Sequence, residues 1–518
     1  MLTRFRLFAL SGGESNGLFR GPTPRDPSPV SLKEKTFTAL GWSFFDNFAN
    51  QGIQFVVGII LARLLTPREF GLIGMIVIFI GLSESFVNSG FSQALIRRRR
   101  CSEEDYSTVF YFNVAAGILL YLTLFFLAGS IGRFYREPNL VGLIRVLGLG
   151  VVISSLGLTQ RAILTRNINF KLLARISIIS SLISGSVGVG MAYCGWGVWS
   201  LVSKTLSQNF VIVGLLWIWN KWKPVFTFSV SAFREMFSFG SKLLLSGLIN
   251  TFHINVYYLI IGKYFSAVTL GYYTRADQFK SVPSSILTEV VGRVAFPVLA
   301  SVQDDEARLK SGYKKLIKCT TLVSFVCMMG MAAVAEPMIR VLIGDKWVFS
   351  VPYLQLLCFS GMLYPLHALN LDMLNVKGRS DLFLRLEIIK QILLVPTIIT
   401  GIFLGIKLMI AAMILTSIIA YFLNSYWSGA MVGYSPREQI IDIMPSFIIA
   451  AAMGICVFVV GYLLPLKPII VLLVQLSIGA LFVIGVAKAV RLDAYLEVKE
   501  FVSDRFQSLT RASGDEPK

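Results

Sequence analysis

Four basic residues lie in or beside long apolar runs of this 518-residue sequence, where charge is costly. Lys204, Arg275 and Lys280 stand within such runs, and Arg63 stands at the end of another. A charge at the centre of a bilayer costs roughly 2.5 to 3.5 kcal/mol on insertion scales, so each one indicates a polar cavity or a partner. Unpaired cations there suit a substrate that bears phosphate, with Lys204 the first candidate. For Arg63 taken singly, snorkelling to lipid headgroups is the simpler interpretation.

Three carboxylates also lie in apolar runs. Glu84 is about 20 Å into its run, and Asp46 is about two turns into its own, at the rise of an α-helix. Neither has an opposite charge one turn away. Each therefore either faces a cavity, where it binds a cation, a proton or a sugar hydroxyl, or forms a hydrogen bond to a neighbouring helix. Glu289 stands four residues before Arg293, a spacing that favours an ion pair on one helix face.

The sequence contains few residues that would indicate a metal site or an enzyme active site. The six cysteines are scattered without a C-x-x-C pair and there are two histidines, so neither a metal site nor a disulfide framework is expected. His253 is either a proton-linked switch or a core residue with its hydrogen bonds satisfied, and the second is commoner. The longest links between apolar runs, near 220–237 and 302–312, are too short for a catalytic domain. We expect no catalytic residue and no cofactor.

Composition places these residues in a polytopic membrane protein. Mean hydropathy is +0.69 and 15% of residues are charged, whereas charged residues make up about a quarter of a soluble domain. Each crossing needs about 20 apolar residues, and its backbone must be helical because lipid offers polar groups no partners. The expected fold is all-α. About fourteen crossings are predicted, near residues 38–62, 71–94, 109–130, 141–163, 173–193, 196–219, 238–262, 272–301, 313–335, 350–376, 382–406, 408–431, 442–464 and 468–488.

The distribution of charge predicts the topology. Most of the 48 Lys and Arg residues fall in alternate links, which become the cytoplasmic ones if both termini are cytoplasmic. The formal net charge of +19 is therefore mainly a topological signal and does not imply nucleic-acid binding. The same basic face is expected to attract anionic membrane lipids.

A repeat at an offset of 200 residues predicts two related halves. Asn50 aligns with Asn250, Arg63 with Lys263, and Gly71 with Gly271. The repeat pairs the first and second crossings with the seventh and eighth, and duplicated halves around a midplane cavity are typical of transporters. We predict a disordered cytoplasmic tail (1–30), an N-lobe of six crossings (31–219), a cytoplasmic linker (220–237), a C-lobe of six (238–431), two extra crossings (432–490) and a cytoplasmic tail (491–518).

Two blocks of sequence carry a family resemblance. ILARLLTPREFGLIGMIVIFIGLSESFVNSGFSQALIRR (Ile60–Arg98) and LIIGKYFSAVTLGYYTRADQFKSVPSSILTEVVGRVAFPVLASVQDD (Leu259–Asp305) resemble the starts of the two lobes of the Wzx-type polysaccharide or O-antigen flippases. These belong to the multidrug, oligosaccharidyl-lipid and polysaccharide exporter superfamily. The resemblance covers roughly residues 31 to 490. Asn255 stands where family members often carry an acid, which argues against ion coupling through that position.

The resemblance implies two six-helix bundles in a V around a central cavity, two added helices, and alternating access in a bacterial inner membrane. The implied substrate is an oligosaccharide linked to an isoprenoid diphosphate, flipped from the inner to the outer leaflet for surface polysaccharide assembly, with polymerase machinery as an open partner. On this view Lys204, Arg275, Lys280 and Arg63 would bind the diphosphate. Asp46, Glu84 and Glu289 would contact sugar or couple transport to H⁺ or Na⁺, if a gradient drives it.

Two other functions remain open. An exporter of small cationic drugs shares the superfamily fold but would depend on carboxylates more than on a cationic cavity. A membrane-embedded glycosyltransferase or polymerase would handle the same lipid carrier, yet such enzymes usually present a sizeable outer loop with catalytic acids, and the outer links here are short and acid-poor. A flippase is the preferred interpretation.

Overall fold

The computed structural model describes residues 32–88, 90–98, 101–490, 492 and 495–497, without the side chains of 32–40, 44, 294 and 380. The predicted tails lie outside these residues, apart from 492 and 495–497. The described elements are α1 (Leu32–Leu64), α2 (Pro67–Asn88), α3 (Phe91–Arg97), α4 (Glu103–Tyr135), α5 (Leu140–Arg166), α6 (Phe170–Tyr193), α7 (Val198–Trp219), α8 (Val230–Tyr264), α9 (Ala267–Ser301), α10 (Glu306–Ala333), α11 (Ala335–Leu342), the 3-10 helix η1 (Asp345–Ser350), α12 (Val351–Gly361), α13 (Tyr364–Val376), α14 (Ser380–Leu404), α15 (Ile406–Ala430), α16 (Pro436–Leu463) and α17 (Pro468–Ala489).

The predicted all-α membrane fold is confirmed in outline. Thirteen described helical segments are long and apolar enough to cross a membrane. The 33-residue α1 is long enough but is not among them. Two crossings are interrupted: Gly90, with φ 71°, separates α2 from α3, and a short break separates α12 from α13. α8 begins at Val230, inside the segment 220–237 that was predicted as a linker, because the Ser229 side chain caps its first turn.

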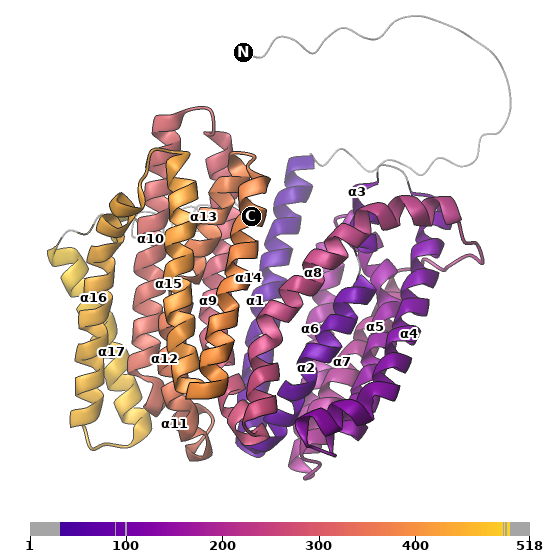
Figure 1. Ribbon diagram of the computed structural model, residues 1–518, viewed down its shortest axis with the longest axis horizontal. Helices are drawn as coiled ribbons and strands as arrows, with labels where there is room; N and C mark the ends of the chain where they lie inside the picture. Colours follow the sequence, from indigo (N-terminus) through magenta and orange to yellow (C-terminus); the bar gives the residue numbers. More distant parts are fainter. Residues whose placement is uncertain (1–31, 89, 99–100, 491, 493–494, 498–518) are drawn as a thin grey trace, which may run out of the picture.

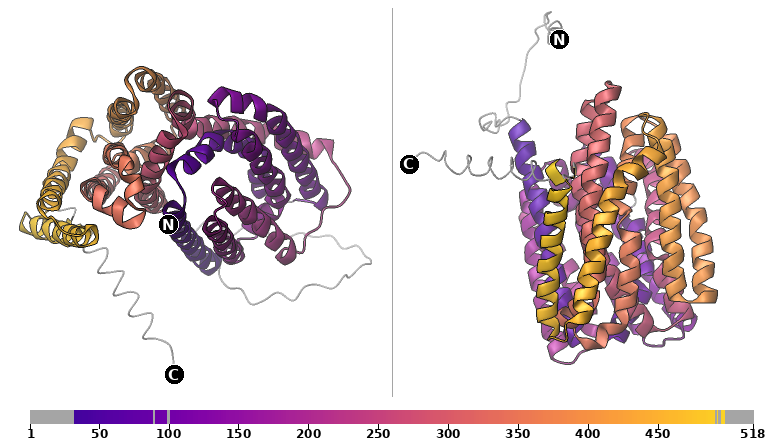
Figure 2. Two further views of the ribbon diagram at one scale, coloured as in Figure 1. Left: turned by 90° about the horizontal axis from the view of Figure 1, so that it is seen from below. Right: turned by 90° about the vertical axis from the view of Figure 1, so that its left-hand side faces the viewer.

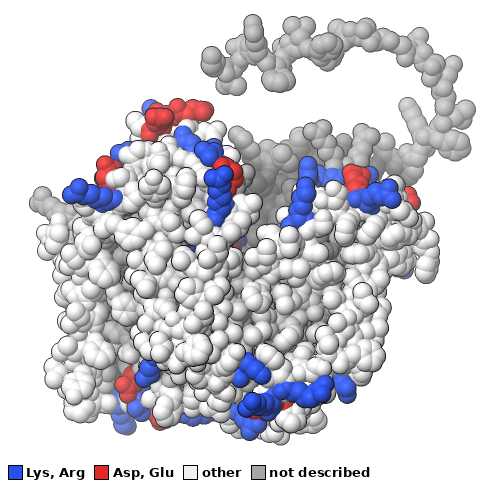
Figure 3. Space-filling model, viewed as in Figure 1, with Lys and Arg blue, Asp and Glu red and all other residues white. Residues whose placement is uncertain are grey.

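The helices form two lobes that lean apart. Figure 1 shows α1–α7 gathered in one lobe and α9–α15 in the other, with α16 and α17 on the outer flank of the second, and the view along the helices in Figure 2 shows the two bundles side by side. We call the end where α1 begins the open end, because the lobes diverge there. The opposite end, where α1 ends and α11 lies, is the closed end. Figure 3 shows charged side chains at both ends, an uncharged belt between them, and an indentation between the lobes at the open end.

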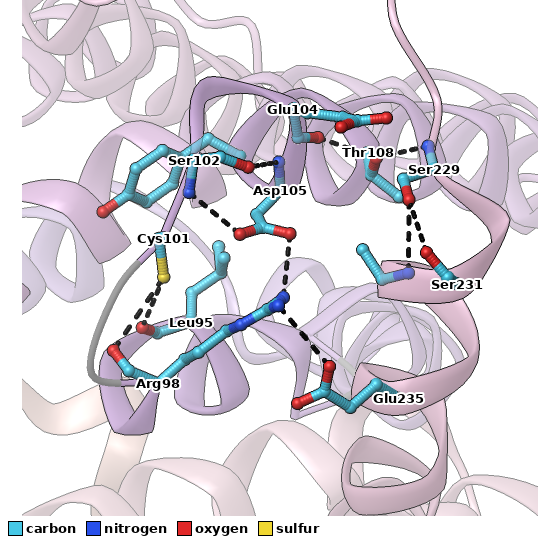
Figure 4. Close-up of polar contacts among 12 residues, drawn as sticks. Leu95, Arg98, Cys101, Ser102, Glu104, Asp105, Thr108, Ser229, Ser231 and Glu235 are labelled. Carbon is cyan, nitrogen blue, oxygen red and sulfur yellow. Dashed lines mark hydrogen bonds and ion pairs between the residues drawn. The ribbon is translucent and has the colours of Figure 1, made fainter.

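α8 joins the lobes diagonally. At the open end Arg98 forms ion pairs with Asp105 of α4 at 2.8 Å and with Glu235 of α8 at 3.5 Å (Figure 4). The Ser229 N–H donates to Thr108 Oγ1 of α4 at 3.0 Å. Near the closed end, other residues of α8 pack with α14 of the C-lobe. The start of α8 therefore belongs to the N-lobe, whereas its later turns contact both lobes, since Lys263 Nζ donates to the Phe134 carbonyl of α4.

α1 lies between the lobes with polar side chains on both faces. Asn47 donates to Glu289 of α9 at 2.5 Å and Gln51 donates to Ser285 at 3.1 Å. On its other face Asn50 and Gln54 form side-chain hydrogen bonds with α6, and Gln54 also forms one with α7 of the same lobe. Amides at about one-turn intervals are costly in lipid unless they face polar groups, so α1 must line the space between the lobes.

Candidate functional site

Two cations from opposite lobes approach each other inside the molecule. Lys204 lies about 9 Å from the closed-end start of α7, and Arg275 lies about 12 Å from the closed-end start of α9, by helical rise. They are near enough for the guanidinium to act electrostatically on the ammonium. Among the described residues neither forms an ion pair. Two like charges held together without acid form a site for an anion, since each lacks a counter-charge.

The surroundings of Arg275 direct it toward the N-lobe. Its guanidinium carbon lies 4.0 Å from the centre of the Phe70 ring of α2. Its Nη1 lies 3.9 Å from the point where a Cβ on Gly58 of α1 would stand, so the missing side chain there leaves it room. The Nε atom is buried with no hydrogen-bond partner, which costs free energy unless a ligand supplies an acceptor.

Lys204 owes its position to a close packing of two helices. A Cβ on Gly188 of α6 would lie 2.8 Å from the Cβ of Lys204 on α7. Glycine at 188 thus lets α6 and α7 approach at this level. The lysine stem packs along this contact, while its ammonium makes no hydrogen bond to a residue that the structure describes.

Lys280, which was treated as an unpaired cation, has a partner. Its Nζ lies 2.7 Å from Asp277 Oδ1 on the same helix, three residues away. The other oxygen of Asp277 accepts from the Tyr258 hydroxyl of α8 at 2.8 Å. Asp277 was not among the predicted residues, although residues three apart share a helix face much as residues four apart do. Lys280 therefore brings less free positive charge to the site than predicted.

Arg63 is exposed at the closed end and binds main-chain carbonyls of the other lobe. Its Nε donates to the Leu342 carbonyl at 2.7 Å, and its Nη2 donates to the Val341 carbonyl. Both acceptors belong to the last turn of α11, at the closed end. Arg63 therefore joins the two lobes, whereas Lys204 and Arg275 form no ion pair with a residue that the structure describes.

The predicted carboxylates differ in their surroundings. Glu289 pairs with Arg293, as the spacing predicts, and also accepts from Asn47 of the opposite lobe. Asp46 lies near Ser177 of α6 and Arg161 of α5, and its Oδ1 has no hydrogen-bond partner.

Glu84 and one further acid complete the set. Glu84 lies near the middle of the 31-residue span Pro67–Arg97, and forms no ion pair with a described residue. Asp372 of α13 was overlooked; its Oδ2 lies 3.9 Å from where a Cβ on Gly292 of α9 would stand. No sequence spacing marks Asp372, because its neighbour is on another helix. Where the structure is described, no three His, Cys, Asp or Glu side chains gather as metal ligands would.

The sequence of residues 60–352 matches the family described as "Polysaccharide biosynthesis protein". The chain belongs to this family. It is 28% identical over 437 residues to the teichuronic acid biosynthesis protein TuaB of Bacillus subtilis (strain 168), covering 83% of this chain and 89% of TuaB. It is 26% identical over 444 residues to the lipopolysaccharide biosynthesis protein WzxC of Escherichia coli (strain K12), covering 82% and 89%.

Two solved structures share the fold of this polysaccharide biosynthesis protein. The lipid II flippase MurJ in an inward closed conformation has a TM-score of 0.72 at 14% identity, covering 88% of this chain and 99% of MurJ. A multidrug resistance MATE family transporter of the MOP superfamily in an inward-facing conformation has a TM-score of 0.60 at 15% identity, covering 74% and 94%. Both likenesses concern the fold alone, and agree with the predicted two-lobed architecture.

His253, the histidine weighed as a switch or a core residue, is half-buried and has a partner on another helix of this family member. His253 Nδ1 lies 2.9 Å from Gln391 Oε1 of α14. His367, which was not singled out, lies against Ser417 and Asn424 of α15 at 3.1 and 3.2 Å. Each ring therefore holds two helices of the C-lobe together.

Proposed function

We propose that the protein is a flippase that moves an oligosaccharide linked to an isoprenoid diphosphate from the inner to the outer leaflet. The observation that carries the proposal concerns Lys204 and Arg275, which lie near each other within the membrane-spanning region and come from opposite lobes. Neither forms an ion pair with a residue that the structure describes. A diphosphate would supply the acceptors that both lack. Charge-assisted hydrogen bonds to phosphate are about twice as strong as neutral ones, and guanidinium can make two in parallel.

The arrangement lowers the barrier that keeps the headgroup on one side. A diphosphate sugar would lose its water in hydrocarbon at a large cost, whereas the polar space between the lobes can replace that water while the isoprenoid chain stays in lipid. Asp46, Glu84 and Glu289 would accept hydrogen bonds from sugar hydroxyls. Lys280 would bind the phosphate in place of its present partner, Asp277.

The open end is assigned to the cytoplasm and the closed end to the outside. This places both termini in the cytoplasm of a multi-pass protein of the bacterial inner membrane, in keeping with the bias of basic residues. In this state the cavity would receive substrate from the inner leaflet, and a rocking motion of the lobes would expose it outside. A polysaccharide polymerase would take up the product. The protein acts as a transporter and not as an enzyme, needs no cofactor, and could draw on an H⁺ or Na⁺ gradient through Asp46 or Glu84.

One observation favours a second function. Asp46 and Glu84 are half-buried and form no ion pair with a described residue, and intramembrane acids of this kind suit an exporter of cationic drugs. Susceptibility of a deletion strain to cationic drugs separates the two. A flippase predicts unchanged susceptibility with loss of surface polysaccharide, and a drug exporter predicts the reverse.

The decisive test is movement of a lipid-linked oligosaccharide in proteoliposomes. Wild-type protein should expose the glycan to an external glycosidase, and Lys204→Ala should slow this at least tenfold while leaving protein abundance normal. Lys407→Ala, which removes an exposed cation at the start of α15, is the matched control. Equal rates for wild type and Lys204→Ala would remove Lys204 from the site, and no movement with wild type would end the proposal.

A further inference from the structure

At the closed end, each lobe caps the C-terminus of a helix in the other lobe. The last turn of α11 in the C-lobe receives hydrogen bonds from Arg63 of α1. The last turn of α1 receives them in return: Lys346 Nζ donates to the Arg63 carbonyl and Trp347 Nε1 donates to the Ala62 carbonyl, both at 2.8 Å. Because the final carbonyls of a helix have no partner in their own helix, these bonds satisfy groups that would otherwise need water.

The exchange is also favourable electrostatically. The C-terminus of a helix carries the equivalent of about half a negative charge, so a cation beside it is stabilised. Arg63 occupies that position for α11, and Lys346 occupies it for α1. Trp347 is fully buried and its ring packs against Phe70 of α2 at 5.5 Å between centroids. We call Ala62, Arg63, Val341, Leu342, Lys346 and Trp347 the closed-end latch.

The latch borders a basic pocket. Arg63, Arg340 and Lys346 line it together with Asp345, and its volume is about 480 Å³. Arg340 is already held by Glu336 and Asp345. Arg63 and Lys346 are held by carbonyl groups, with Glu69 of α2 close enough to attract Lys346.

The latch lies nearer the closed end than the cationic pair. Arg275 approaches α1 at Gly58, and Arg63 follows five residues later on the same helix, about 7 Å farther toward the closed end. An anion that leaves Arg275 and crosses toward the closed end would reach the level of Arg63 and Lys346 within about two turns of α1. Its full negative charges would compete for these side chains against helix ends that carry only partial charge.

We propose that the closed-end latch is released by the phosphate groups of the substrate, which take Arg63 and Lys346 away from the helix ends that they cap. The proposal rests on the proposed function only for the identity of the anion. Arrival of the headgroup would then loosen the contact that keeps the far side shut. Binding of the phosphate groups by Arg63 and Lys346 is thereby coupled to opening of the closed end.

Hydrogen exchange of the full-length protein in nanodiscs tests the latch without transport. Trp347→Phe keeps an aromatic ring but removes the indole donor, and Arg63→Met keeps the stem but removes the guanidinium. Each should speed exchange about tenfold in peptides on both sides, 60–66 and 339–350, as loss of a charged or buried hydrogen bond predicts. Trp196→Phe, on the exposed link between α6 and α7 at the same end, should change neither. An effect confined to the lobe that carries the substitution would overturn the latch.

Inorganic pyrophosphate tests the release. At equal ionic strength, pyrophosphate but not chloride should speed exchange of both peptides in the wild type, and should add nothing in Arg63→Met. Unchanged or slower exchange in the wild type would overturn release by phosphate. If the latch responds while proteoliposomes move no lipid-linked glycan, the proposed function fails and the anion-released latch stands.

Discussion

Gly71 of α2 lies directly against the main-chain carbonyl of Ala267 of α9, so that a Cβ added at Gly71 would stand 1.7 Å from that oxygen. The relationship is reciprocal: a Cβ on Gly271 would stand 1.8 Å from the carbonyl oxygen of Pro67. Residues 67 and 71 are the counterparts of 267 and 271 in the repeat of 200 residues. The two lobes therefore meet at the closed end through equivalent backbone surfaces, and only glycine permits the approach.

Gly71→Ala and Gly271→Ala should each prevent this contact, because the obstruction is backbone and cannot rotate away. We expect loss of surface polysaccharide by about tenfold or more and a destabilised closed end, with normal membrane insertion. Gly190→Ala, at an exposed position of α6 with no atom near its Cβ, is the control and should leave output unchanged. Full output from Gly71→Ala would show that the approach is dispensable.

Removal of the Lys204 ammonium, which lies near Arg275, should stabilise the fold but impair transport. Lys204→Met relieves the repulsion from Arg275 and the burial of an unpaired charge, a change worth on the order of 1 kcal/mol. Thermal unfolding in detergent should therefore shift upward, and glycan movement should fall. Lys407→Met should alter neither. A lower unfolding temperature for Lys204→Met would mean that the ammonium has a stabilising partner.

Asp277 should be coupled to Lys280. Asp277→Asn leaves the lysine without its carboxylate and should reduce the free energy of unfolding by about 2 kcal/mol, as expected for a partly buried ion pair. Lys280→Met in the same chain should restore part of this loss, because no uncompensated cation is left. The double-mutant cycle, measured by thermal unfolding, isolates the pairwise energy. Additive losses would rule out the coupling.

The two acids that bind Arg98 should differ in importance. Asp105 is buried and also completes a capping box with Ser102 at the start of α4, so Asp105→Ala should cost about 1 to 2 kcal/mol. Glu235 is largely exposed, with a longer contact to Arg98, so Glu235→Ala should cost less than about 0.5 kcal/mol. Thermal unfolding of the two variants compares them directly. Equal losses would contradict the assignment of the cap.

The sequence predicted those features that depend on neighbours along one helix. Apolar length predicted the crossings, since lipid leaves the backbone no alternative to the helix. Spacing predicted the ion pair of Glu289 with Arg293, because residues four apart share a helix face. Residues three apart also share a face, so spacing could have paired Lys280 with Asp277 as well.

Only the tertiary structure decided which partner each charged side chain finds on another helix. Nothing local to Arg63 indicates that it caps α11, nearly 280 residues later in the chain, and nothing local to Asp372 places it beside α9. Lys204 and Arg275 become a candidate anion site only when α7 and α9 bring them together from opposite lobes. The reason is physical: hydropathy and helical spacing act within a segment, whereas the partner of a buried charge depends on how the segments pack.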